Sequence, residues 1–204
     1  MLVMLQTKPD KPANAYRTGK QSSQTIYFDS DVPKSPYELK EQLIAMFRHH
    51  RIYSREIVVL CIGSDRSTGD SLGPLIGYKL EKYHMSDVSI YGTLQSPVHA
   101  ANLTEKLDEI YSLHSNPFIL AIDASLGTKD HIGYITLGNG PLRPGLGVNK
   151  ELPDVGDIHI TGIVNFSGMM ESLLLQTTRL SQVMRLADTI SKAVLYGISE
   201  YFEM

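Results

Sequence analysis

Apolar and polar residues alternate along the chain in blocks that predict strands and helices in turn. The continuous apolar runs at 56–63 and 118–122 contain β-branched residues and are typical of strands buried on both faces. Apolar residues spaced three or four apart predict helices over 35–50, 70–83, 98–114 and 169–202. Shorter strands are expected at 88–92, 133–137 and 158–164. This alternation predicts an α/β fold, a three-layer α/β/α sandwich with a mostly parallel central sheet.

The first 35 residues differ from the rest of the chain. They are rich in Lys, Pro, Gln, Ser and Asn, and they hold too few apolar residues to offset the entropy of ordering them. We therefore expect a flexible or loosely docked arm over 1–35 and a single domain over 36–204. Thr25–Phe28 is the exception within the arm, since its residues favour a strand added to a sheet edge or docked on a partner.

Composition narrows the classes of function. The chain has 204 residues, of which 42% are apolar and 20% charged, enough for one sizeable core. A net charge of −3 disfavours nucleic acid as a partner, although it leaves room for a local basic patch. Without an apolar run long enough to span a membrane or a secretory signal, a cytoplasmic location is expected. The single cysteine, Cys61, excludes a disulfide scaffold or thiolate zinc site and is expected in the core.

Two segments bring a carboxylate to the carboxyl end of a predicted strand. The strand over 56–63 runs into a polar loop that leads to Asp70, and the strand over 118–122 is followed by Asp123. Ligands of open parallel sheets bind beyond these strand ends. If the two strands are neighbours, the aspartates face each other and share one proton, because two close carboxylates do not both ionise readily. Such a pair activates water for amide hydrolysis.

Structural explanations compete with this hypothesis. Asp70 is well placed to be the N-cap of the helix that follows it. Asp123 lies at the end of a buried strand, where an unpartnered charge is costly, and this favours a functional role. Asp65 and Arg66 are expected either to pair with each other at the surface or to contact substrate.

Other motifs indicate different chemistry but lack the context that it needs. The segment from Gly69 to Gly73 matches the G-x-S-x-G elbow of esterases, but Ser71 follows a loop instead of the strand itself. No histidine occurs after His159 to complete a triad. The glycines also lack the spacing of dinucleotide and P-loop sites.

The sequence leaves two roles undecided, that of the loop Gly138–Lys150 and that of the histidines. The loop Gly138–Lys150 contains glycines and prolines that suit either a mobile lid or an ordinary connection. The histidines form no i, i+4 pair on a helix, so a metal site would have to combine Asp70, Asp123 and one histidine. The histidines considered are His49, His50, His99, His131 and His159.

Three motifs in a fixed order carry a resemblance to a known family. They are Thr68–Pro74 after the first buried strand, then Ala121–Ala124, then Arg143–Lys150. Over about 56–176, this order resembles the germination protease family of spore-forming bacteria. The catalytic aspartates of that family match Asp70 and Asp123. The resemblance implies a phosphorylase/hydrolase-like fold, shared with hydrogenase maturation endopeptidases, whose equivalent acidic positions bind nickel together with a histidine.

The chain also departs from the germination protease pattern. Germination proteases are longer, carry an N-terminal propeptide and assemble as tetramers, and they tend to have proline where Gly69 stands. The two aspartates can therefore persist while substrate choice, activation and assembly differ.

These observations lead to one expected function. We expect an endopeptidase without a cofactor, in which Asp70 and Asp123 share a proton and activate water. Thr68, Ser71 and the backbone amides near Gly69 are expected to orient the pair or to hold the oxyanion. The resemblance implies small acid-soluble spore proteins as substrates, in the cytoplasm of a sporulating cell or forespore.

Further expectations concern substrate contacts, assembly and rival functions. Asp65 and Asn149 are expected to contact substrate, together with Thr68 and Ser71. The apolar C-terminal helices suggest a homo-oligomer, with a dimer as the expected state. The alternatives are a non-catalytic binding or assembly protein that holds a partner in the crevice or through Thr25–Phe28, and a metal-dependent maturation peptidase.

Overall fold

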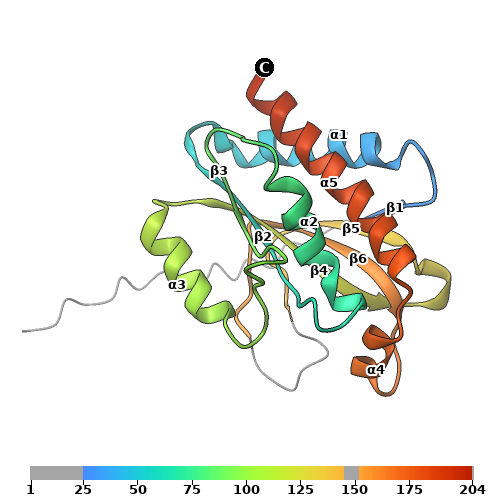
Figure 1. The fold of residues 1–204 in the computed structure, drawn as a ribbon. Coiled ribbons are helices and arrows are strands. Elements are labelled where there is room, and N and C mark those ends of the chain that lie inside the picture. Colours follow the sequence, from blue (N-terminus) through green and yellow to red (C-terminus); the bar gives the residue numbers. More distant parts are fainter. Residues whose placement is uncertain (1–24, 145–151, 204) are drawn as a thin grey trace, which may run out of the picture.

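A six-stranded sheet lies at the centre of the protein, in the order β1-β5-β6-β4-β2-β3. The computed structural model describes residues 25–144 and 152–203 (Figure 1). The strands are β1 (Ile26–Asp29), β2 (Ile57–Cys61), β3 (Val88–Tyr91), β4 (Phe118–Gly127), β5 (Tyr134–Asn139) and β6 (Ile158–Phe166). Strands β3, β2, β4 and β6 are parallel, and β5 is antiparallel to both of its neighbours. The mostly parallel sheet confirms the predicted α/β fold.

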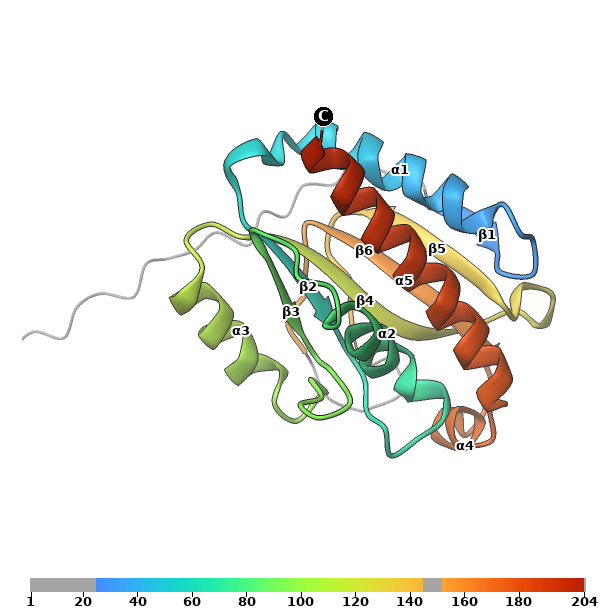
Figure 2. The ribbon, with the colours of Figure 1, turned by 45° about the horizontal axis from the view of Figure 1, so that its top comes forward.

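Helices cover both faces of the sheet. The helices are α1 (Ser35–His50), α2 (Leu72–Leu80), α3 (Leu103–Leu113), α4 (Glu171–Gln176) and α5 (Leu180–Glu203). Helices α1, α2 and α5 pack on one face, whereas α3 packs on the other (Figures 1 and 2). Short 3-10 helices occur at η1 (Ile52–Ser54), η2 (Gly69–Ser71) and η3 (Lys129–His131). Among the described residues, no helix is both long and apolar enough to cross a membrane.

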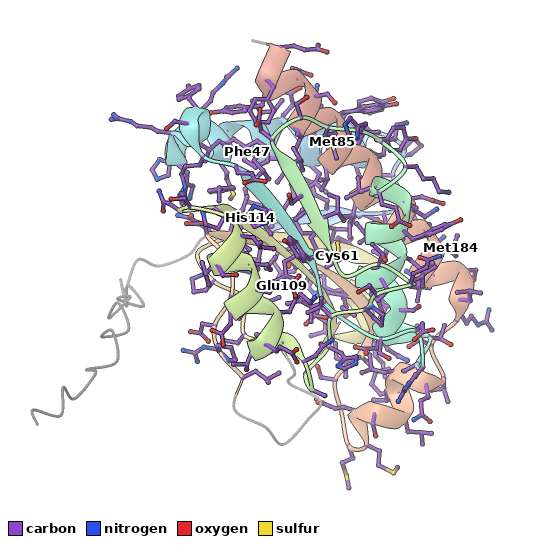
Figure 3. The ribbon with its side chains drawn as sticks, turned by 60° about the vertical axis from the view of Figure 1, so that its left-hand side comes forward. Phe47, Cys61, Met85, Glu109, His114 and Met184 are labelled. Carbon is purple, nitrogen blue, oxygen red and sulfur yellow. The ribbon has the colours of Figure 1, made fainter. Side chains whose placement is uncertain are left out.

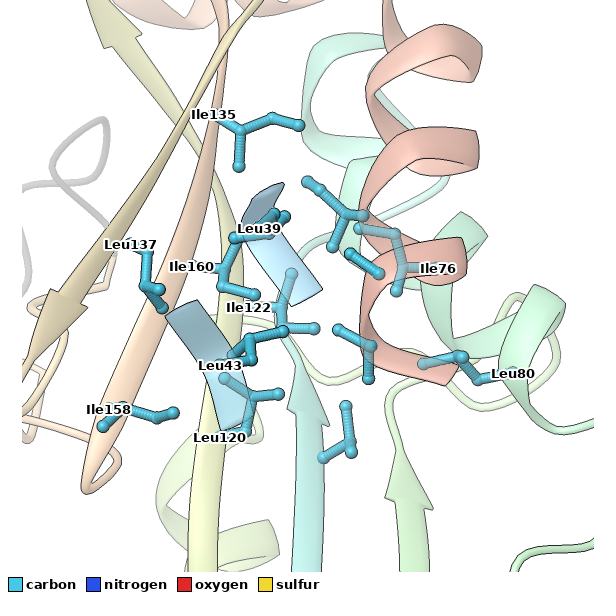
Figure 4. Close-up of a cluster of buried hydrophobic side chains, with 14 of the residues drawn as sticks. Leu39, Leu43, Ile76, Leu80, Leu120, Ile122, Ile135, Leu137, Ile158 and Ile160 are labelled. Carbon is cyan, nitrogen blue, oxygen red and sulfur yellow. The ribbon is translucent and has the colours of Figure 1, made fainter. Parts of the chain in front are cut away.

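The central strands are apolar on both faces because each face has its own core. Along β4, Leu120 and Ile122 point toward α1, α2 and α5, and Figure 4 shows Leu120 beside Leu43 of α1. Ile119 and Ala121 point the other way, toward α3. Each set follows the two-residue period of a strand. Cys61 of β2 is fully buried in the larger core (Figure 3), as expected, and burial raises the pKa of its thiol.

Several element boundaries differ from the prediction. Helix α3 begins at Leu103 instead of residue 98, because Val98 forms a parallel bridge with Ile62. Strand β4 continues to Gly127, since its pairing with β6 extends through a bulge at Ser125/Leu126. Within the predicted arm, residues 26–29 form β1, which pairs with β5. Residues 1–24 and 145–151, which include most of the arm and the centre of the candidate lid, lie outside the described residues.

Glycines allow α2 and η2 to lie directly against the carboxyl end of β2. A Cβ atom at Gly73 would overlap the carbonyl oxygen of Ile62, and one at Gly63 would overlap that of Asp70. Gly63 also has a φ of +140°, which side-chain-bearing residues rarely adopt. The backbone N–H of Ser64 donates to the Asp70 carbonyl oxygen over 3.1 Å. This contact determines where Asp70 lies.

We expect Gly73→Ala to destabilise the fold by about 1–3 kcal/mol, because the new methyl group must displace backbone rather than a flexible side chain. Urea unfolding measures this change. Gly197→Ala in α5 is the matched control, since its Cβ would meet no atom closer than 3.6 Å. Alanine has the higher helix propensity, so this control should be neutral or stabilising by up to about 1 kcal/mol. Equal stability of the two variants would contradict the close-approach argument.

Candidate active site

Two aspartates from neighbouring segments meet at the carboxyl edge of the sheet. Strands β2 and β4 are adjacent, and their last register pair joins Cys61 to Ile122. Asp123 therefore lies one residue beyond the paired end of β2, and the chain that leaves β2 returns to this edge through η2, which carries Asp70. The neighbouring strands on which the sequence hypothesis depended are present.

Asp123 is a buried carboxyl group in the middle of a strand. Only 8% of the residue is exposed, and its Oδ1 accepts a hydrogen bond of 2.7 Å from the backbone N–H of Ala124. The prediction that Asp123 stands at a strand tip is wrong, because β4 continues for four residues beyond it. Burial, and secondly the charge of Asp70, raise the pKa of Asp123 well above its usual value.

Asp70 is half-buried and has a different environment. Its predicted role as the N-cap of the following helix is wrong, because the N-cap of α2 is Ser71 and no side chain caps η2 or α2. Burial raises the pKa of the Asp70 carboxyl, whereas the backbone N–H of Ser64 and the side chain of His99 lower it. The pKa of Asp70 is therefore raised overall, but less than that of Asp123, and this difference favours ionised Asp70 beside protonated Asp123.

His99 belongs to the same site, although the sequence analysis considered it only as one of five histidines that could join the two aspartates in a metal site. Val98 accepts a hydrogen bond of 2.8 Å from the Gly63 N–H, which brings this connection beside the chain that leads to Asp70. The backbone N–H of His99 donates a hydrogen bond of 2.8 Å to Asn102 Oδ1. The Ala101 N–H lies 3.3 Å from His99 Nδ1, which fixes the position of the ring in the loop before α3.

The sequence analysis did not single out His99 from the other histidines, because it placed the residue inside a helix over 98–114. The signal that was available is an asparagine three residues after the histidine, at the start of the apolar helical repeat. Asparagine at that place is typical of a helix start, and it puts His99 in the preceding loop.

The remaining predicted site residues are not all brought together. The Ser71 hydroxyl donates to the Thr68 carbonyl oxygen over 2.7 Å, and the Ser71 N–H donates to the Ser67 and Thr68 carbonyls. Both polar groups of Ser71 are thus used within η2. Asp65 is exposed, and within the described part of the chain no ion pair joins it to Arg66. Asn149 lies outside the described residues.

Metal ligation was the other arrangement considered for these aspartates. Over residues 25–144 and 152–203, no three His, Cys, Asp or Glu side chains are grouped closely enough to hold a metal ion.

Comparison with known proteins assigns the family. The family model described as "Protein of unknown function (DUF1256)" matches residues 27–193, a span that includes both aspartates and His99. The chain belongs to the DUF1256 family. A Bacillus subtilis (strain 168) protein described as "Uncharacterized protein YyaC" is 53% identical over 140 residues, which cover 69% of this DUF1256 chain and 68% of the relative.

One solved structure also resembles this DUF1256 protein. It is the crystal structure of HycI, a [NiFe] hydrogenase maturation protease from Thermococcus kodakarensis KOD1. The similarity has a TM-score of 0.41 and 18% identity, and it covers 71% of this chain and 96% of HycI. It is too distant to indicate a shared activity.

We expect Asp123→Asn to stabilise the protein at pH 7, by about 2–4 °C in Tm for each kcal/mol gained. Because the pKa of Asp123 is raised in the folded state, the stability associated with it is full below the unfolded pKa of about 3.9 and is lost as the pH rises through the folded pKa. Asparagine does not titrate and keeps an oxygen for the Ala124 N–H.

Thermal unfolding from pH 4 to pH 8 measures this difference, which should shrink toward pH 4. Asp108→Asn is the matched control, because Asp108 is an exposed carboxylate on α3. A D123N variant that is less stable than the parent at pH 7 would show that the buried carboxyl is ionised and stabilised.

Proposed function

We propose that this DUF1256 protein is an endopeptidase in which Asp70 and Asp123 activate water. The observation that supports this most is the pair itself: two carboxyl groups close enough for the charge of Asp70 to raise the pKa of Asp123, at the ligand-binding edge of the sheet. Structural carboxylates are rarely placed where they repel each other, because each then costs stability.

The different surroundings of the two groups assign their roles. Asp123 is buried and lies beside a negative neighbour, so it holds the proton and acts as the acid. Burial raises the pKa of Asp70 as well, but less than that of Asp123, because the Ser64 N–H and the charge of His99 favour the ionised form of Asp70, so it acts as the base. An acid and a base of the same residue type are separated in this way by environment alone.

The proton transfers balance over one cycle. Asp70 removes a proton from water as the water oxygen bonds to the scissile carbonyl carbon, while Asp123 donates its proton to the carbonyl oxygen. When the tetrahedral intermediate collapses, the carbon–nitrogen bond breaks, and the leaving amine takes the proton from Asp70. Asp123 recovers its proton from the hydroxyl group that becomes the new carbonyl oxygen.

The other predicted residues keep supporting roles in the proposal. Ser71 and Thr68 shape η2 through the hydrogen bond between them, and in this way they hold Asp70 in place. Asp65, exposed on the loop before η2, remains a proposed substrate contact, as does Asn149. Small acid-soluble spore proteins are the proposed substrate class, by resemblance to the germination protease family.

We expect Asp70→Asn and Asp123→Asn each to reduce cleavage by about 10²–10⁴-fold, because each removes a group that transfers a proton in the reaction. The assay incubates purified protein with acid-soluble spore proteins and follows new fragments by mass spectrometry. Asp108→Asn should cleave at the parental rate. If the parent binds spore proteins but releases them intact, the protein is a binding module, and if either aspartate variant cleaves normally, the paired mechanism is wrong.

We expect His99→Ala to move the acidic limb of the pH–rate profile to higher pH. The His99 side chain lowers the pKa of Asp70, so its removal raises that pKa, and more alkaline conditions are then needed to ionise the base. Initial rates between pH 4 and pH 8 measure the limb. His84→Ala, at an exposed histidine after α2, is the matched control. A uniformly lower rate with an unmoved limb would assign His99 a purely structural role.

A further inference from the structure

A depression lies on the helical face, away from the aspartates. It has a volume of about 350 Å³ and runs between the last turn of α2 and the middle of α5, helices that lie side by side in Figures 1 and 2. Its lining residues are Lys79, Leu80, Lys82, Tyr83, Asp188, Ser191, Lys192, Leu195 and Tyr196. We call this depression the lysine groove. Asp70 precedes α2, whereas the groove adjoins its other end, about 15 Å away at 1.5 Å per helical residue.

Positive charge exceeds negative charge in the lysine groove. Three lysines line it against one carboxylate, Asp188, which forms an ion pair of 2.7 Å with Lys79. Lys82 and Lys192 have no carboxylate within ion-pair distance among the described residues. Their ammonium groups lie over tyrosine rings, Lys82 Nζ at 4.3 Å from the centroid of Tyr78 and Lys192 Nζ at 4.9 Å from that of Tyr37.

Lysines on α1 and α3 and at the start of α1 are paired with carboxylates. Lys34 pairs with Glu38 at 2.8 Å, Lys40 with Glu200 at 2.6 Å, and Lys106 with Glu109 at 2.5 Å. The chain as a whole has a net charge of −3, so the excess positive charge at Lys82 and Lys192 is local. An ammonium group has three N–H donors, and a ring face does not satisfy them all.

The residues that line the lysine groove limit the kind of anion that can bind there. Its floor includes the buried Leu80 and the half-buried Leu195, and the rings of Tyr83 and Tyr196 are 53% and 44% exposed at its rim. A bare phosphate has no apolar group to pack on the half-buried Leu195 or on the rings of Tyr83 and Tyr196. Nucleic acid is held by several cations along its backbone, and only two unpaired ammonium groups are present here. Carboxylates on side chains that flank an apolar residue match both the charges and the floor.

We propose that the lysine groove binds an acidic segment of a partner polypeptide. The carboxylates of that segment pair with Lys82 and Lys192, and an apolar side chain between them packs on the half-buried Leu195 between the two exposed tyrosines. This site is separate from the paired aspartates, and binding there does not require proteolytic activity.

Fluorescence anisotropy tests the proposal with a labelled peptide of alternating glutamate and leucine, compared with the same peptide carrying glutamine in place of glutamate. The binding variant is the double substitution Lys82→Gln and Lys192→Gln. The control double substitution, Lys106→Gln and Lys129→Gln, removes the same charge outside the groove. Lys129 is well matched because its ammonium group also lies over a ring, 5.2 Å from the centroid of Phe166.

We expect the glutamate peptide to bind the parent, the glutamine peptide to bind at least tenfold more weakly, and the groove variant to weaken glutamate-peptide binding by about tenfold. The control variant and Asp123→Asn should bind as the parent does. Equal binding of the two peptides, or equal weakening in the groove and control variants, overturns the proposal. Tighter binding of tripolyphosphate or single-stranded DNA than of the peptide, lost in the groove variant, also overturns it and assigns the groove to phosphate-bearing ligands.

Discussion

The position of Asp70 depends on direct contact between two stretches of backbone, the end of β2 and the segment that forms η2 and α2. Any side chain at Gly63 or Gly73 would push these stretches apart. The segment after β3 is packed equally closely against α2 and β2. A Cβ at Gly77 of α2 would overlap the carbonyl oxygen of Gly92, and one at Gly92 would overlap that of Cys61. Gly92 begins the connection that leads to His99, so all three segments of the site are held to one strand end. The glycines thus have a packing role, which explains why their spacing does not fit a nucleotide-binding loop.

Close packing at this edge produces an electrostatic consequence. Asp123 enters the site from a central strand and is buried, whereas Asp70 enters from a short 3-10 helix and stays half exposed. Two identical side chains therefore differ in the free energy of ionisation before any substrate is present. Burying a carboxyl beside another carboxylate lowers stability at neutral pH, and such a cost is typical of sites that carry out chemistry. The arrangement of the backbone thus determines how far each carboxyl group is buried, and this burial produces the difference between the two pKa values.

The sequence predicted the fold well where the pattern was long and simple. The apolar run that became β2 and the helical repeat that became α1 were placed to within two residues of their observed ends. It also predicted that Asp70 and Asp123 lie near each other, because chain segments that leave neighbouring parallel strands converge at one edge of the sheet. It failed where partners distant in the chain decide the outcome. The extension of β4 to Gly127 depends on pairing with β6, and the loop position of His99 depends on the bridge between Val98 and Ile62. No local pattern contains either contact.

The lysine groove was missed for the same physical reason, and it shows what α2 contributes to the whole protein. Its two unpaired cations are more than a hundred residues apart in the sequence, since Lys82 follows α2 and Lys192 lies in α5. Tyr37 of α1 also contacts Lys192. A charge count for the whole chain gives −3 and hides this local excess. Helix α2 joins the two regions, since Asp70 precedes its first turn and the groove adjoins its last. Because glycine contacts press the helix against the sheet, the spacing between the regions is set by the length of a rigid helix, so a ligand in the groove lies at a fixed distance from the aspartates.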